Sequence, residues 1–179
     1  MIGYIAFALF AMTIPVANWL IGNVGTMCIP NGPCMVPVDF GLFGLMAPSG
    51  VLVVGAALVL RDIVHERLGG SWALAAIAVG AVLSAFLSPA ALIVASVAAF
   101  TFAELADFAV YSPLRKRNLT MAVLASGAVG AVVDSAVFLW LAFGSLAFIE
   151  GQIVGKLWMT AAAAGALYVT RALRVRAAA

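Results

Sequence analysis

The stretch Ala90–Tyr111, AALIVASVAAFTFAELADFAVY, decides how the fold of this chain is interpreted. Its first part, 90–103, carries no charge, and the whole stretch is long enough to cross a bilayer core of about 30 Å as a helix. Glu104 and Asp107 follow without a break in the apolar pattern. A helix places residues three apart on one face, with Tyr111 a further turn along. Because a carboxylate near the centre of a membrane helix costs ~2.5–3.5 kcal/mol, two on one face indicate a function or a partner.

The composition predicts a helical membrane protein. Of the 179 residues, 66% are hydrophobic and only 9% are charged, whereas a soluble domain has about 25% charged residues and cannot bury so much apolar surface. The length allows six spans with short loops and no separate soluble domain. We therefore predict one all-α integral membrane domain over residues 1–179, a bundle of six transmembrane helices. The expected spans are approximately 4–21, 50–68, 72–87, 90–111, 119–143 and 152–173, with an outer loop at 22–39.

Turn residues separate several of the apolar runs, at Gly69-Gly70, Ser88-Pro89, Ser112-Pro113 and Gly144-Ser145. No basic segment precedes the first run, so we expect a retained span rather than a cleaved signal. The second and fourth runs both end in an acidic segment that continues the helix. This likeness suggests two three-helix halves of inverted topology, an arrangement common in transporters.

The basic residues predict the orientation in the membrane. Eight of the nine Lys and Arg residues follow the second, fourth and sixth runs, which share one side of a six-span chain. The opposite loops contain Asp39 and Glu150 but neither Lys nor Arg. By the positive-inside rule, we expect both termini in the cytoplasm. The net charge of +2 is scattered over helix ends and gives no indication of nucleic-acid binding.

The outer loop contains Cys28 and Cys34, separated by IPNGP. In an oxidising exterior the pair could close a short disulfide, and two free thiols are the alternative. No metal site is expected, because neither a His nor a second Cys pair is nearby. The segment 40–47, FGLFGLMA, is too short to span, and is either a re-entrant or interfacial segment or the start of the second span.

Charged residues crowd the end of the second span. Arg61 and Asp62 directly follow its apolar run, and we predict that they form a buried pair. Asp62 is also spaced for contacts with His65 and Glu66, and Arg61 for a contact with His65. We interpret Glu66 and Arg67 as an ordinary charged helix end that reaches the interface. His65, the only His, is either a proton relay or an interfacial side chain.

The fifth span contains a stripe of small residues that ends at Asp134, in the middle of the span. Small residues let another helix or a ligand approach the backbone closely. An ion pair with Lys156 of the last span is one interpretation of Asp134, and a substrate or proton site is the other. We favour the second, because a pair buried only for stability seldom repays its desolvation.

The last span places Gln152 and Lys156 on one face, with Trp158 beside them as an interfacial anchor or a stacking residue. Together with the acids of the other spans, these residues predict a polar cavity. Tyr111 and Ser135 are further hydrogen-bonding candidates. Such a cavity suits a flat, donor-rich small molecule. A carboxylate accepts from adjacent N–H groups, as along the Watson–Crick edge of a guanine-like base, while Lys and Gln serve carbonyl acceptors.

Several segments resemble the VUT family, the bacterial vitamin-uptake transporters now regarded as queuosine-precursor transporters. They are APSGVLVVGAALVLRDIVHERLGG (Ala47–Gly70), FTFAELADFAVYSPLRKR (Phe100–Arg117), GAVGAVVDSAVFLWLAFG (Gly127–Gly144) and GQIVGKLWM (Gly151–Met159). The resemblance implies six helices in the cytoplasmic membrane of a bacterium, with the chain encoded by the bacterium or by a phage. It also implies uptake of 7-cyano- or 7-aminomethyl-7-deazaguanine. The chain departs from the enteric members in its shorter N-terminus and in its loop with two Cys residues.

The resemblance and the polar residues together predict the roles of individual side chains. We expect Glu104 or Asp134 to accept from N1–H and the 2-amino group of the base. Its O6 is expected to bind Lys156 or Gln152, and Phe138 or Trp158 to cover its face. A second group is expected to carry coupling protons or to form ion pairs: Arg61, Asp62, Asp107 and Tyr111.

Two other classes of protein compete with this interpretation. A substrate-binding membrane subunit of an ATP-driven vitamin importer also has about six helices, but it does not transport alone. An intramembrane enzyme is disfavoured, because no G-x-S-x-G occurs and an aspartyl pair of Asp107 and Asp134 lacks a supporting motif. We expect no enzymatic activity and no cofactor. The expected partners are a nucleobase-like small molecule and the lipid bilayer, with no nucleic acid, and a homo-oligomer is left open.

Overall fold

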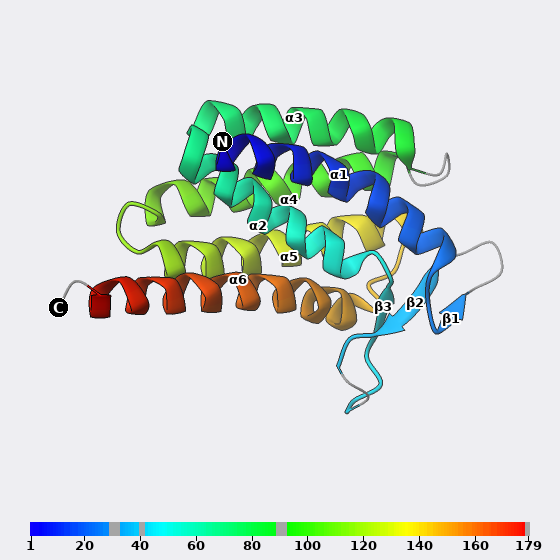
Figure 1. The fold of residues 1–179 in the computed structure, drawn as a ribbon. Coiled ribbons are helices and arrows are strands. Elements are labelled where there is room, and N and C mark those ends of the chain that lie inside the picture. The colour runs from blue at the N-terminus through cyan, green and yellow to red at the C-terminus, as the bar shows by residue number, and fades with distance from the viewer. Residues whose placement is uncertain (29–32, 40–41, 89–92, 178–179) are drawn as a thin grey trace.

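A computed structural model describes residues 1–28, 33–39, 42–88 and 93–177 of the chain, and over these residues six helices pack side by side with a small sheet at one end (Figure 1). The expected start of the fourth span at residue 90 lies outside the described residues. In chain order the elements are α1 (Ile2–Asn23), β1 (Met27–Cys28), β2 (Cys34–Pro37), β3 (Met46–Pro48), α2 (Val51–Leu68), α3 (Gly70–Leu87), α4 (Ile93–Leu114), α5 (Leu119–Phe143) and α6 (Ile149–Ala177).

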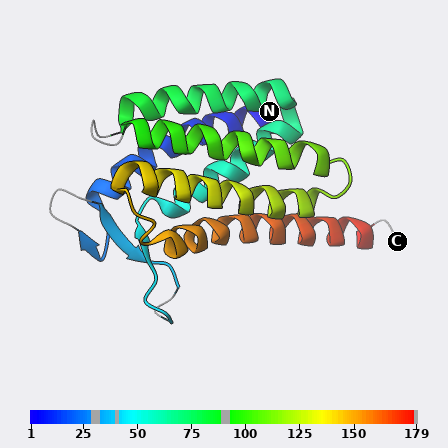
Figure 2. The same cartoon turned by 180° about the vertical axis from the view of Figure 1, so that it is seen from behind.

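Successive helices run in opposite directions along a common axis, so the bundle has two distinct ends (Figures 1 and 2). One end, which we call the termini end, holds both chain termini, the α2–α3 turn and the 115–118 loop between α4 and α5. The other, the sheet end, holds the three strands and the 144–148 connection between α5 and α6. The helices α3 and α6 lie on opposite sides of the bundle in both views.

The architecture is that of an all-α membrane protein. Within the described residues, four helices are long and apolar enough to cross a membrane: α1, α3, α4 and α5. They present large apolar side chains outward, including Phe86, Phe102 and Trp140, which are all more than half exposed. Such faces suit lipid and not water. The all-α membrane class is confirmed, whereas six crossings and two inverted halves stay predictions, since α2 carries several charged side chains along its second half.

The helix bounds differ from the expected ones at several places. Ser112-Pro113 is not a turn, because α4 continues through Pro113 and ends at Leu114. The helix α6 begins at Ile149, three residues before the expected start at 152, with Glu150 in its first turn. An acidic side chain is favourable there because it faces the positive end of the helix dipole. Of the segment 40–47, residues 40–41 lie outside the described residues, and residues 42–47 do not begin α2, because Ala47 is held in an extended strand next to Pro48.

The strands β1 and β2, which lie in the expected outer loop, form a three-stranded antiparallel sheet of order β1-β2-β3 with β3, which follows that loop. Cys28 and Cys34 face each other across β1 and β2, with Cα atoms 3.8 Å apart, and are joined by a disulfide. The sheet is also tied to the helices. Ser49 Oγ donates a hydrogen bond to the Leu20 carbonyl at the end of α1 (2.7 Å), and the indole Nε1 of Trp158 in α6 donates to the Val38 carbonyl (2.8 Å).

Glycines of α2 and α5 set how closely four helices approach one another. A Cβ atom at Gly55 of α2 would lie 2.8 Å from the backbone oxygen of Lys156 in α6, and one at Gly127 of α5 would lie 2.6 Å from the Thr160 side chain. At Gly130, a Cβ atom would lie 3.2 Å from Asp107 of α4. Side chains larger than hydrogen would force these helices apart, so the small residues bring the polar groups of α2, α4, α5 and α6 together.

Candidate functional site

A cavity of about 760 Å³, its mouth included, lies in the half of the bundle nearer the sheet end. All six helices contribute to its lining. Most of the wall is apolar, with Phe138 of α5 and Phe100 of α4 as its aromatic members. Ligand sites in proteins are typically concave, mostly apolar and furnished with a few polar groups, and this cavity has that character.

One side of the cavity carries a charged group built from α5 and α6. The Lys156 ammonium is almost fully buried and lies 2.6 Å from Asp134 Oδ2. It also donates hydrogen bonds to Ser135 Oγ (2.7 Å) and Gln152 Oε1 (2.9 Å). The three N–H groups of Lys156 therefore have three acceptors. Asp134 remains 15% exposed and lines the cavity together with Gln152.

A second polar group lies nearer the termini end, where α2 packs against α4. The fully buried Arg61 guanidinium pairs with three carboxylates. Its Nη1 lies 2.9 Å from Asp62 Oδ1, its Nε lies 3.0 Å from Glu104 Oε2, and its Nη2 contacts Asp107 Oδ1. We call Arg61, these three acids and Tyr111 the arginine cluster.

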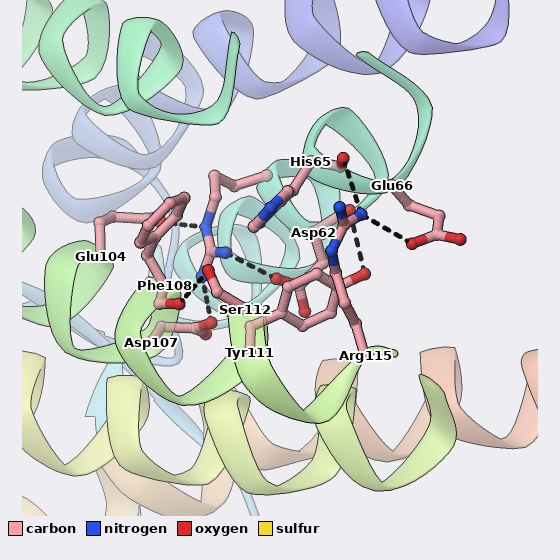
Figure 3. A network of polar contacts seen from close by, with 10 residues as sticks. Asp62, His65, Glu66, Glu104, Asp107, Phe108, Tyr111, Ser112 and Arg115 are labelled. Atoms are coloured by element: carbon pink, nitrogen blue, oxygen red, sulfur yellow. Dashed lines mark hydrogen bonds and ion pairs between the residues drawn. The ribbon is translucent and has the colours of Figure 1, made fainter. Parts of the chain in front are cut away.

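Tyr111 closes one side of the arginine cluster, as Figure 3 shows. Its hydroxyl donates to the Asp62 carbonyl (3.3 Å), and its ring centroid is 5.7 Å from Arg61 Cζ, within range of a cation–π interaction. His65 stacks on Phe108, with ring centroids 4.9 Å apart, and does not pair with Asp62 by any contact found in the described residues.

The charged end of α2 beyond the cluster reaches the surface. Glu66 is exposed and pairs with Arg115 of the α4–α5 loop at 3.1 Å, and Arg67 is exposed as well. Both residues have the exposure expected of an interfacial helix end.

The structure separates the predicted substrate-binding residues. Four of them line the cavity: Asp134, Phe138, Gln152 and Lys156. Glu104 does not line it and belongs to the arginine cluster, although it lies within electrostatic range of Asp134. Trp158 faces the sheet instead, where it binds Val38. The second predicted group is brought together in the arginine cluster: Arg61, Asp62, Asp107 and Tyr111.

Sequence reasoning missed a group of neutral polar residues in the cavity wall. Ser84 and Ser88 at the end of α3 are buried, and their Oγ atoms lie 3.4 Å apart. Asn18 of α1 and Ser96 of α4 also line the cavity. The signal that could have found the first two is their spacing, because serines four apart in an apolar run share one helix face.

The comparisons with known proteins identify a family. The chain shows no significant similarity to the curated proteins or to the solved structures with which it was compared. The profile of a family described as "Putative vitamin uptake transporter" matches residues 84–171. This range contains the cavity residues of α4, α5 and α6, and the two acids that α4 contributes to the arginine cluster. Over this part of the chain, the protein matches the family of vitamin uptake transporters, the VUT family.

Proposed function

We propose that this protein is a secondary transporter that imports a planar, nucleobase-like molecule, a precursor of queuosine, across a bacterial cytoplasmic membrane. The observation that carries the proposal is the cavity between all six helices, with Asp134 and Gln152 in an otherwise apolar wall. The match of residues 84–171 to the VUT family supports the transport of a small molecule. The resemblance of the motifs to queuosine-precursor transporters supports the finer assignment.

The cavity offers groups that complement a 7-deazaguanine. The Asp134 carboxylate has about four lone-pair sites, so it can accept from the N1–H and 2-amino groups while it keeps its ion pair with Lys156. Gln152 uses its carbonyl oxygen to accept from Lys156, which leaves its amide N–H groups as the donor for O6. Lys156 then orients Asp134 and Gln152 instead of binding the base itself. Phe138 supplies an aromatic surface for the ring.

The arginine cluster is our candidate for energy coupling. With every group ionised, it holds one positive and three negative charges, and a buried net charge is costly. Protons taken up by the excess carboxylates would remove that charge, so we propose that the cluster carries the coupling protons. Glu104 is the member best placed to report occupancy of the cavity, because it lies within electrostatic range of Asp134.

The two ends of the bundle support an orientation. The disulfide between Cys28 and Cys34 lies at the sheet end, and disulfides persist in oxidising compartments. Arg67 and Arg115 lie at the termini end, and cytoplasmic loops are enriched in basic residues. We therefore propose that the sheet end faces outward, that both termini are cytoplasmic, and that the helices α2 and α6 also cross the membrane.

Uptake into proteoliposomes tests the proposal. The purified protein, with an inward proton gradient and no ATP, should accumulate labelled 7-cyano- or 7-aminomethyl-7-deazaguanine. Asp134→Asn should lower uptake by tenfold or more, whereas Glu150→Gln, an exposed acid at the sheet end, should leave it unchanged. Transport of neither compound, or full uptake by a correctly folded Asp134→Asn variant, would contradict the proposal. Uptake without ATP also excludes a subunit that needs a separate ATPase.

A second measurement separates binding from coupling. In Glu104→Gln, exchange of labelled for unlabelled base across the membrane should persist, because Glu104 does not line the cavity. Accumulation driven by the proton gradient should be lost. Equal accumulation by the variant and the unaltered protein would remove Glu104 and its cluster from the coupling step.

A further inference from the structure

We propose that the loop between β2 and β3 is a lipid-binding surface, which lies among the headgroups and outermost acyl-chain carbons of the leaflet at the sheet end. Leu42 and Phe43, which we call the loop tip, are the side chains that enter the lipid. The partner is the bilayer itself. The inference therefore goes beyond the transport of a cargo and does not depend on which molecule is carried.

The first observation is that the loop has its polar group inside and its apolar groups outside. Asp39 is buried, and its carboxylate accepts hydrogen bonds from the backbone N–H groups of Phe43 (2.5 Å) and Leu45 (3.1 Å). By contrast, Leu42 is 75% exposed and Phe43 is 82% exposed. In water this arrangement leaves two large apolar side chains hydrated, which is unfavourable. Contact with lipid buries the loop tip and leaves the hydrogen bonds of Asp39 intact.

The second observation is that the base of the loop is fixed to the bundle. The Val38 N–H donates to the Leu45 carbonyl (3.0 Å) and closes the loop, while the Val38 carbonyl accepts from the Trp158 indole of α6 (2.8 Å). At the start of β3, the Met46 carbonyl lies so close to the first turn of α6 that a Cβ atom at Gly151 would clash with it. The loop tip therefore has a defined place relative to the helices.

The third observation is the depth of the loop in the bilayer. The 22 residues of α1 form a helix about 33 Å long, close to the ~30 Å thickness of the hydrocarbon core. The helix ends at Asn23, shortly before β1, so the sheet lies near the boundary between core and headgroups. The described part of the loop projects from the sheet past α6, across the bundle axis, in both views (Figures 1 and 2). That direction runs along the membrane surface.

The apolar surface continues from the loop onto the connection between α5 and α6. The segments 44–46 and 146–151 line a common cavity of about 590 Å³, its mouth included. Phe148 of this connection and Trp140 near the end of α5 are both more than half exposed. The loop thus adjoins the lipid-facing surface of the bundle. Because residues 40–49 carry no charge, the surface suits the apolar part of the interface and needs no anionic headgroup.

Depth-dependent fluorescence quenching tests this proposal. In the full chain, Phe43→Cys is labelled with nitrobenzoxadiazole while the Cys28–Cys34 disulfide stays oxidised, and the protein is placed in phosphatidylcholine vesicles. Phe102→Cys, exposed in the middle of α4, marks the lipid core, and Lys116→Cys, exposed in the α4–α5 loop, marks water.

The three labels should differ in their environment. The label in place of Phe43 should emit at a shorter wavelength than the label in place of Lys116. A nitroxide near the lipid headgroup should quench it at least twofold more than a nitroxide near the end of the acyl chain. The label in place of Phe102 should show the reverse order, and the label in place of Lys116 should respond to aqueous iodide alone.

Three results would overturn the proposal. Equal emission from the labels in place of Phe43 and Lys116, without quenching by lipid, would place the loop in water. Short-wavelength emission without quenching by lipid would show that protein, such as a second copy of the chain, covers the loop. Stronger quenching by the deep nitroxide would place the loop in the core. Because the vesicles contain no cargo, none of these results bears on the proposed transport.

Discussion

Replacement of Arg61 by Met should destabilise the protein far more than the same replacement of Arg67 or Arg115. The Arg61 guanidinium is fully buried and pairs with three carboxylates, those of Asp62, Glu104 and Asp107. Removal of one partner from a buried ion pair costs about 3–5 kcal/mol, because the other partner is left buried and unpaired. Since three carboxylates lose their common cation, the upper part of that range is expected. For a chain of this size, about 2–4 °C of melting temperature corresponds to 1 kcal/mol, which predicts a decrease of roughly 10–20 °C.

Thermal unfolding in detergent micelles, followed by near-ultraviolet circular dichroism, measures this decrease. Arg67→Met, at an exposed position of the same helix, should shift the melting temperature by no more than about 2 °C. Arg115→Met breaks a partly exposed pair with Glu66 and should cost about 0–1 kcal/mol. The triple variant Arg61→Met, Glu104→Gln, Asp107→Asn should recover most of the lost stability, because it also removes two of the three charges that Arg61 balances. A melting temperature of Arg61→Met equal to that of Arg67→Met would refute the reasoning.

Three smaller perturbations test other parts of the fold. Gly55→Ala should destabilise the protein by about 1–3 kcal/mol, because its Cβ atom would lie 2.8 Å from the backbone of α6. In Gly165→Ala the added Cβ atom meets no atom within 4 Å, so this variant should be neutral or stabilising. Melting temperatures measure both effects. Asn118→Ala should cost about 1 kcal/mol, because the Asn118 side chain accepts from two backbone N–H groups at the start of α5, and chemical denaturation can measure this loss. Cys28 and Cys34 should react with an impermeant maleimide on intact cells only after reduction; labelling before reduction would contradict the disulfide.

Local relationships within helices could be predicted from the sequence because the helical repeat fixes them. The spacing of Glu104, Asp107 and Tyr111 predicts one face, and all three are buried in α4. Two of the expected turns also follow from residue type. Gly69 and Gly144 end their helices with φ values of 95° and 63°, a region that side chains with a Cβ atom rarely adopt.

Relationships between helices could not be predicted in the same way. Arg61 meets Glu104 and Asp107 across 43 and 46 residues of sequence, and the amphipathic pattern fits several other pairings equally well. The direction of Trp158 depends on the sheet, whose strands are short and lack a strong alternating pattern. Ser84 and Ser88 carry no charge, so a charged residue within an apolar run, the signal that predicted Asp134, does not mark them.

The attachments of the β-sheet have a consequence for how the cavity opens. A disulfide joins β1 to β2, Ser49 after β3 binds α1, Trp158 of α6 binds Val38 after β2, and β3 leads into α2. The sheet is attached to three helices, so it cannot move about a single hinge. We therefore expect that any widening of the cavity at this end displaces α1, α2 and α6 together with the sheet.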